Sequence, residues 1–422
     1  MQLLQLPREL LAQVLYNLTD VRDLVSLSST CHTARLFCSE DNPLLWQCIY
    51  LRNYDDPRQT PLFLPEAGLG ICQTWEDDKC WYQELKKRYS VLRKLRYIEY
   101  RNEELNDDEA GAMVDVILDM LDTAKAAPTS AEVGKGAKPR VDDRYLSLNL
   151  AHLPQHPPSD EFDSFIRGLP IRPYSVGAHM PGGWESSTTS GPVTRSRATM
   201  SSDKTVRSDA AYRLHVLCGI SPQEQNDEKY LAKARRVVYD WDTTNANNDY
   251  GLYKPDGSGE IDWRRLDATM TVASRQFCMA VRARMNIPIG LCFSIPNRIL
   301  LDEKLPEDWA RCTGQWSGTY VFLHWEDLVE YNLSRDAPHR PTLDNGPEAC
   351  GGLMKMELKL DMRLAGDKRL HTDLPVHEDE RYPPLYFSGL SRSYDYQMTT
   401  GVRGMVCLIK GGREVRWRYI IQ

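Results

Sequence analysis

Two histidine pairs have a spacing that could bind a metal ion. His152 and His156 are four residues apart, a spacing that would place both imidazoles on one side of a helix, but Pro154 lies between them and interrupts that helix. His371 and His377 lie in an acidic loop that could hold a cation, although solvated charge is the commoner state of such loops. We therefore expect no metal site and no cofactor.

A glycine-rich segment, residues 255–262, has an Asp, Gly and Ile spacing similar to that of a calcium-binding loop. The charges do not fit, because the alignment places Lys254 at the first ligand position and Arg265 where a bidentate Glu should stand. We expect a turn, followed by a helix that Asp262 caps.

Catalytic motifs are absent from the chain. It has no G-x-S-x-G elbow, no phosphate-binding glycine loop and no H-E-x-x-H pair. Cys31 falls within a predicted helix as a core residue, with no base placed near it by spacing. An uncharacterised enzyme would therefore lack any supporting motif, and we expect a non-catalytic protein.

Composition sets further limits on function. The net charge of −7, from 52 basic and 59 acidic side chains, argues against nucleic-acid binding, and helical spacing spreads Lys86, Lys87 and Arg88 over a solvated face. The 11 cysteines form no C-x-x-C pair, which favours reduced thiols. There is no basic-then-apolar leader and no stretch apolar enough to span a bilayer, so we expect no membrane association and a cytoplasmic or nuclear location.

The elements that could position a functional surface begin at the N-terminus. From Glu9 to Leu18, apolar residues recur one and four positions apart, which places them on one face of a helix. Thr19 or Asp20 could cap a second helix, and a third is predicted from Ser28 to Leu36 with Cys31, Ala34 and Leu36 inside. Asn42 and Pro43 are typical of an N-cap followed by proline at the first helical position.

These residues resemble an F-box in order and spacing, although an ordinary amphipathic hairpin could also place leucines in this way. The resemblance is carried by Leu6 to Leu11, Val14, Leu15, Leu18, Asp23, Leu24, Leu27, Cys31, Arg35, Leu36, Leu45 and Trp46. It implies a non-catalytic subunit of a ubiquitin ligase that binds a Skp-family adaptor and, through it, a cullin. The implied adaptor contacts are Leu6, Pro7, Leu10, Val14, Leu15, Leu18 and Leu24.

The remainder of the chain divides by composition. We expect an α+β protein with a three-helix F-box at residues 1–50 and a linker and helical stalk at 51–126. A mainly helical middle region follows at 127–300, with a mobile, Ser-rich loop at 174–208. Residues 301–422 form a β-rich domain, an antiparallel barrel or sandwich.

Three features support that β-rich domain. Apolar residues alternate with charged ones from Met354 to Leu364, which indicates a half-buried strand. Residues 402–409 and 415–421 flank a Gly-Gly centre, which favours a β-hairpin. Further strands are predicted at 315–322 and 384–389.

Several segments also resemble a group of F-box proteins common in basidiomycete fungi, namely 214–220, 234–241, 255–259 with Asp262 and Trp263, and 316–320. Strands within about the last 120 residues are remotely similar to the β-barrel substrate domain of certain animal F-box-only proteins, whose chains continue beyond the matching strand. The substrate therefore remains an unknown protein.

Aromatic residues of the β-rich domain are the candidates for binding that substrate, because Trp and Tyr dominate binding hot spots. The candidates are Trp316, Tyr320, Trp325, Tyr386 and Trp417. Each could instead pack in the core. In the alternative function, the F-box serves a non-degradative adaptor complex and the β domain binds a small ligand or a sugar.

Overall fold

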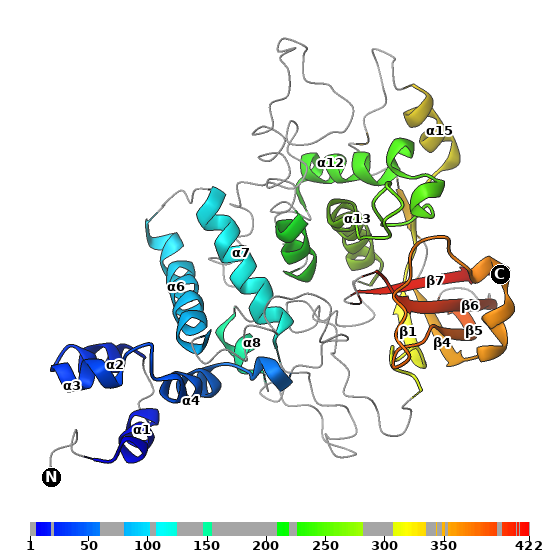
Figure 1. The fold of residues 1–422 in the computed structure, drawn as a ribbon. Helices are drawn as coiled ribbons and strands as arrows, with labels where there is room; N and C mark the ends of the chain where they lie inside the picture. The colour runs from blue at the N-terminus through cyan, green and yellow to red at the C-terminus, as the bar shows by residue number, and fades with distance from the viewer. Residues whose placement is uncertain are drawn as a thin grey trace, which may run out of the picture. The chain divides into compact units, whose positions relative to one another are not determined.

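A computed structural model of the 422-residue chain shows an α+β architecture with N-terminal helices and a C-terminal antiparallel sheet (Figure 1). It describes residues 6–17, 21–59, 80–101, 107–124, 147–153, 209–218, 226–281, 307–334, 343, 348–350, 353–394, 399–410, 412 and 414–421. The predicted loop at 174–208 lies outside these ranges. The chain forms two compact units, one of residues 1–103 and 115–155 and the other of 104–114 and 156–422.

The first unit begins with four short helices, one more than the three expected. They are α1 (Arg8–Tyr16), α2 (Val21–Ser28), α3 (His32–Phe37) and α4 (Pro43–Asn53). Pro7 precedes α1 as its N-cap, and Pro43 occupies the first turn of α4 after Asn42, as the sequence predicted. The predicted caps Thr19 and Asp20 lie outside the described residues.

Leucines from several of these helices form the small core of the module. Its buried residues are Leu11, Leu15, Leu24, Ala34, Leu45 and Trp46. Two residues predicted to join this core do not. Cys31 is exposed, because it caps α3 and its Sγ accepts a hydrogen bond from the Ala34 N–H at 3.4 Å. Leu36 is 60% exposed, on the solvent side of α3.

One short turn and three further helices follow. They are the 3-10 turn η2 (Pro57–Gln59), α6 (Cys80–Arg101), α7 (Asp107–Asp122) and α8 (Leu148–His152). The apolar spacing predicted α6 and α7 correctly, since Trp81, Leu85, Leu92, Ile117 and Leu121 are all buried. α4 packs on α6, where the Trp46 and Tyr82 ring centroids are 4.8 Å apart.

The second unit contains a layer of helices. Residues 209–218 are helical, and they are followed by α12 (Glu228–Tyr239), η4 (Trp241–Thr243), η5 (Ala246–Asn248), α13 (Trp263–Val281) and α15 (Trp325–Leu333). α12 and α13 pack through Ala234, Ala268 and Val272. α12 ends at Tyr239, and Trp241, two residues further on, is 37% exposed.

Buried charges join these helices to their neighbours. Arg235 Nε on α12 lies 2.5 Å from Glu348 Oε1 on strand β3 (Glu348–Cys350), and both side chains are almost fully buried. His215 Nδ1 lies 2.5 Å from Asp267 Oδ1 on α13. The predicted cap of α13 is confirmed, because Asp262 Oδ1 accepts a hydrogen bond from the Arg265 N–H at 3.0 Å.

The C-terminal sheet has five antiparallel strands in the order β1-β4-β5-β6-β7. These strands are β1 (Gly314–Gly318), β4 (Met354–Leu360), β5 (Leu385–Ser393), β6 (Thr399–Leu408) and β7 (Val415–Ile421). A separate pair joins β2 (Val321–Leu323) to β3. The predicted terminal hairpin is confirmed as β6 and β7, whose register pairs Leu408 with Val415.

Two predicted strands differ from the structure. The segment 315–322 is not one strand, because the chain leaves the five-stranded sheet at Gly318 and continues into β2. The alternation from Met354 holds only to Leu360, since Asp361 then accepts the Arg363 N–H and opens the 3-10 turn η6 (Met362–Gly366). A second turn, η7 (Lys368–Leu370), follows in the same way after Asp367.

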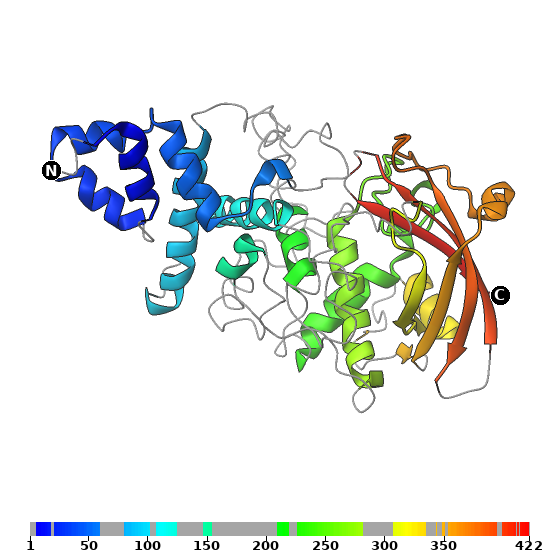
Figure 2. The same ribbon diagram turned by 90° about the horizontal axis from the view of Figure 1, so that it is seen from below.

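The sheet curls into a half-barrel (Figure 2). Trp316 on β1 and Trp417 on β7 belong to the two outer strands, which in a flat sheet would lie about 19 Å apart. Their ring centroids are only 5.0 Å apart. The face that carries both tryptophans is therefore the concave one, and the Phe387 ring of β5 also contacts Trp417 at 5.5 Å.

Candidate functional site

The first candidate surface is the exposed side of α1. Pro7, Leu10 and Val14 are three and four residues apart, so they form one stripe along the helix. Leu10 is 48% exposed and Val14 is 42% exposed, whereas Leu11 and Leu15 face inward at 3% and 2%. α1 is therefore apolar on two sides, of which only one packs within the module.

More apolar side chains are exposed on the neighbouring helices. Val25 on α2, Leu36 on α3 and Leu44 on α4 are 58%, 60% and 69% exposed. These three were not among the contacts predicted from the sequence. For Val25 and Leu44 the available signal was the adjacent Leu24 and Leu45, which already supply the inward positions.

The seven predicted contact residues thus fall into different environments. Pro7, Leu10 and Val14 are exposed, and Leu6 is partly buried. Leu15 and Leu24 are 2% and 1% exposed, so they shape the module from inside and do not present a surface. Leu18 lies outside the described residues.

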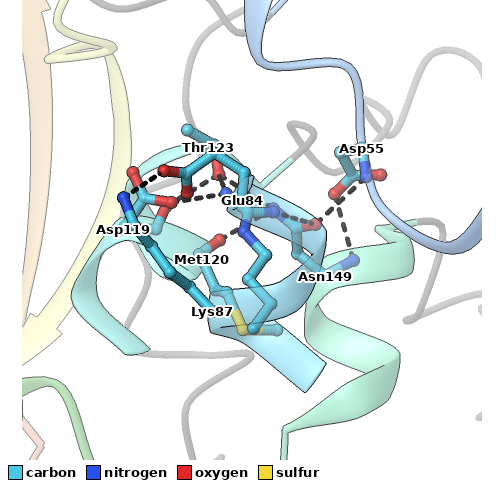
Figure 3. Close-up of polar contacts among 8 residues, drawn as sticks. Asp55, Glu84, Lys87, Asp119, Met120, Thr123 and Asn149 are labelled. Atoms are coloured by element: carbon cyan, nitrogen blue, oxygen red, sulfur yellow. Dashed lines mark hydrogen bonds and ion pairs between the residues drawn. The ribbon is translucent and has the colours of Figure 1, made fainter. Parts of the chain in front are cut away.

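A buried polar network connects the end of α4 to α6, α7 and α8 (Figure 3). At its centre, Arg88 on α6 is fully buried and donates hydrogen bonds to the Asp119 carboxylate and, at 3.1 Å, to Thr123 Oγ1. Its Nη1 is 3.4 Å from Asn149 Oδ1 on α8. The guanidinium also lies over the Tyr50 ring at 5.0 Å. This placement corrects the prediction that Arg88 lies on a solvated face.

Asn149 extends the network to the segment after α4. Its Nδ2 donates to the Met120 carbonyl at 2.9 Å, and its Oδ1 accepts the Asp55 N–H at 3.0 Å. The Asp55 carboxylate in turn accepts from the Leu148 N–H at 2.9 Å and the Ser147 hydroxyl at 2.5 Å. These groups bind one another, so the network fixes four segments and offers no open site for a substrate.

Electrostatics in this network follow from burial. Burial raises the pKa of the Asp119 carboxyl, and the nearby Arg88 guanidinium opposes that rise. Burial likewise raises the pKa of the Tyr50 hydroxyl, again opposed by Arg88. The positive charge of Arg88 thus favours the charged form of the buried Asp119 carboxyl.

The five predicted substrate-binding aromatics lie at four different places in the second unit. Trp316, which is 38% exposed, and Trp417 meet on the concave face. Tyr386 lies on the opposite face of the sheet, in a cluster with the buried Leu370 and Met405.

The other two aromatics are outside the five-stranded sheet. Tyr320 precedes β2, is 50% exposed and stacks on Phe322 at 5.9 Å. Trp325 begins α15, is 70% exposed and lies 6.3 Å from Trp241. The structure therefore assembles only Trp316 and Trp417, and Tyr386 is a packing residue.

His152 and His371 each lie within hydrogen-bond distance of a backbone carbonyl. His152 ends α8, and its Nε2 lies 2.8 Å from the Asn53 carbonyl, while His156 is outside the described residues. His371 Nε2 is 3.1 Å from the Ala365 carbonyl. The described ranges contain no group of three or more His, Cys, Asp or Glu side chains that could hold a metal ion. Among the residues that the structure describes, every helix is too short or too polar to cross a membrane.

Comparison with known proteins identifies the N-terminal module. Residues 3–52 match the F-box-like family model, a range that includes α1 to α4 nearly to the end of α4. No curated protein and no solved structure matches the chain. The chain thus carries an N-terminal F-box-like domain, and the resemblances of the remaining segments to other F-box proteins stay predictions.

Proposed function

We propose that this chain is the substrate-recognition subunit of a Skp-cullin-F-box type ubiquitin ligase. The F-box-like domain would bind a Skp-family adaptor and through it a cullin, while the second unit would bind an unknown protein substrate. The match of residues 3–52 to the F-box-like family carries the proposal. The exposed apolar stripe of Pro7, Leu10 and Val14 supports it, because a small module that leaves such a stripe in water has a surface suited to a partner.

Such a subunit needs no catalytic residue of its own. It would hold the substrate near a ubiquitin thioester carried by another subunit, and thereby raise the effective concentration of the substrate lysine. The buried network around Arg88 suits this task, because it holds α4 of the F-box-like domain to α6, α7 and α8. The network thus fixes the F-box-like domain to the helices that follow it within the first unit.

The proposed adaptor contacts are Pro7, Leu10 and Val14, with Leu6 at their edge. Leu15 and Leu24 would support these contacts from within the module, since both are buried. On the substrate side, Trp316 and Trp417 remain proposed contacts on the concave face of the sheet. Trp325 and Tyr320 remain proposed contacts outside it.

The adaptor assignment can be tested by co-purification of the full chain with a Skp-family adaptor and a cullin. Val14→Asp places a charge in the exposed stripe and should abolish co-purification without unfolding α1. Gln13→Asp is the matched control, because Gln13 is the exposed neighbour of Val14 and receives the same charge. Retention of full adaptor binding by Val14→Asp would contradict the proposed docking face.

A second candidate function is an F-box protein in a non-degradative adaptor complex whose β domain binds a small ligand or a sugar. The Trp316 and Trp417 pair favours it, because a partly exposed aromatic pair on a concave sheet can stack on a flat ligand or a sugar ring. Ubiquitin-remnant proteomes of cells that carry the wild-type chain or the Val14→Asp variant separate the two functions. A substrate receptor predicts modified proteins that depend on Val14, and the alternative predicts none.

A further inference from the structure

Helix α15 is apolar on two faces, but only one of them is covered. Leu328 and Tyr331 pack against the buried Leu323 and Leu343. Trp325, Val329 and Leu333 recur every four residues on another face of the helix. Trp325 is 70% exposed and Leu333 is 73% exposed, which is unusual for side chains of this size.

A second tryptophan extends this apolar face. Trp241 in η4 is 37% exposed, and its ring centroid lies 6.3 Å from that of Trp325. Asn332 on α15 fixes the two elements together, because its Oδ1 accepts the Trp241 N–H and its Nδ2 donates to the Tyr239 carbonyl, each at 3.0 Å. The tryptophans are thus held in place before any partner arrives. Figure 1 shows α15 close to the C-terminal end of α12, from which η4 continues.

The charged side chains of α15 and η4 themselves are all negative. Glu326, Asp327 and Glu330 are exposed on α15, and Asp242 is exposed next to Trp241. Neither α15 nor η4 contains a lysine or an arginine. A cation that rested on a tryptophan face would therefore also gain attraction from these carboxylates.

We infer that the α15 face, defined by Trp241, Trp325, Val329 and Leu333, binds a protein segment that carries lysine or arginine beside a large apolar side chain, and, resting on the proposed function, that this segment belongs to the substrate. The apolar side chain would pack between Trp325 and Leu333, and the cation would lie against a tryptophan ring near the acidic groups. A second copy of this chain fits less well, because it would bring acidic groups against acidic groups. The negative charge equally disfavours a nucleic acid.

The test is selection of a displayed library of random dodecapeptides on the full-length protein. Some selected peptides should bind the wild-type protein but not the double variant Trp325→Ser, Leu333→Ser. These peptides should be enriched in Lys and Arg beside Trp, Phe or Leu. The best selected peptide is then measured by fluorescence polarisation. Trp325→Ser should weaken its binding by at least about tenfold, as expected for an anchor residue. Glu326→Lys with Glu330→Lys should weaken it in the same direction, most strongly at low salt.

Two controls distinguish the possible outcomes. Glu357→Lys makes one Glu-to-Lys replacement at an exposed position on β4, half the charge change of the double variant, and should leave peptide binding unchanged. All variants should keep the wild-type circular dichroism and adaptor binding. Three outcomes would overturn the inference. They are selection of acidic peptides, no enrichment of any peptide, and a wild-type dimer that the Trp325→Ser variant no longer forms. If the wild-type protein did not bind the adaptor, the proposed function would be contradicted, but the peptide result would stand.

Discussion

Arg88 on α6 donates a hydrogen bond to the carboxylate of Asp119 on α7, and the arginine side chain is completely buried. The pair lies where α4, α6, α7 and α8 meet, so it acts on the connection between the F-box-like domain and the helices behind it. A buried ion pair is a weak source of net stability, but removal of one partner leaves an uncompensated charge in the interior.

Arg88→Met should therefore destabilise the protein strongly, by about 3–5 kcal/mol in the free energy of unfolding. The size of the change comes from the Asp119 carboxylate, which would lose its cation in a site where burial already raises its pKa. Chemical denaturation of the full chain measures the change.

The double variant Arg88→Met with Asp119→Leu provides the control for that prediction. It removes both charges, so it should be more stable than Arg88→Met alone. Arg93→Met is the matched single control, since Arg93 is an exposed arginine on the same helix. Equal stability of Arg88→Met and Arg93→Met would contradict the assigned role of Arg88.

Sequence spacing identified most of this helical framework but not the buried arginine. Trp81, Leu85, Leu92 and Leu95 predicted the inward face of α6 correctly. Arg88 lies on that same face, seven residues after Trp81 and four before Leu92. The charge of Arg88 led to the prediction of a solvent-exposed position, although its spacing placed it on the inward face. The groups that stabilise it in the interior belong to Asp119, Thr123 and Asn149, which are far away in sequence.

The sheet was predictable strand by strand, but its curvature was not. Alternation gave the inward side of β4, and the Gly-Gly centre gave the β6–β7 hairpin. Which aromatics share a face depends on the pairing of all five strands, which places Phe387 on the concave face and Tyr386 on the opposite one. Trp325, counted among the aromatics of residues 301–422, begins helix α15 outside the five-stranded sheet.

The contact between Trp316 and Trp417 should contribute to closure of the half-barrel. Trp316→Ala should lower the free energy of unfolding by more than about 1 kcal/mol, because it removes buried ring surface as well as the contact with Trp417. A double-mutant cycle with Trp417→Ala should give a coupling energy of about 0.5–1.5 kcal/mol, the range found for aromatic pairs. Trp325→Ala is the control, since Trp325 lies outside the five-stranded sheet. A coupling energy of zero would mean that the two rings are neighbours without mutual stabilisation.

Gly404 on β6 is predicted to tolerate no side chain. A Cβ atom there would lie 2.3 Å from Phe387 Cζ and 2.5 Å from the Arg418 carbonyl oxygen, so both a buried ring and the backbone of β7 would have to move. Gly404→Ala should destabilise the sheet by about 1–3 kcal/mol.

Gly318→Ala is the matched control for Gly404→Ala. Gly318 lies on the same face of the same sheet, and a Cβ atom there would meet nothing within 4 Å. Its replacement should leave the thermal unfolding midpoint unchanged or slightly higher, because alanine loses less backbone entropy on folding. Equal destabilisation by the two substitutions would show that the close contact at Gly404 is not the cause.

A local motif, Asp-x-Arg, closes four turns among the residues that the structure describes, and the sequence analysis did not predict it. In each, the aspartate accepts the N–H of the residue two positions on and the guanidinium of the same arginine. The pairs are Asp56–Arg58, Asp361–Arg363, Asp367–Arg369 and Asp379–Arg381. Because the partners are only two residues apart, the spacing is a local signal for such turns, but it is not sufficient, since Asp262-Trp263-Arg264 has the same spacing and Asp262 there caps α13 through the Arg265 N–H.

Asp379 provides the pH test of this motif. Hydrogen bonds from the Arg381 side chain and backbone lower the pKa of Asp379 from 3.8 to about 2. Because the folded pKa is below the unfolded one, this group's stabilisation is complete above about pH 3.8 and is lost as the pH falls through about 2. Arg381→Ala keeps the backbone hydrogen bond, so the pKa should rise only part of the way to 3.8, as measured by NMR titration of the carboxyl carbon. Arg363→Ala, which removes the partner of Asp361 instead, should leave the Asp379 titration unchanged. If the Asp379 pKa were the same in Arg381→Ala as in the wild type, the guanidinium contact would not be its cause.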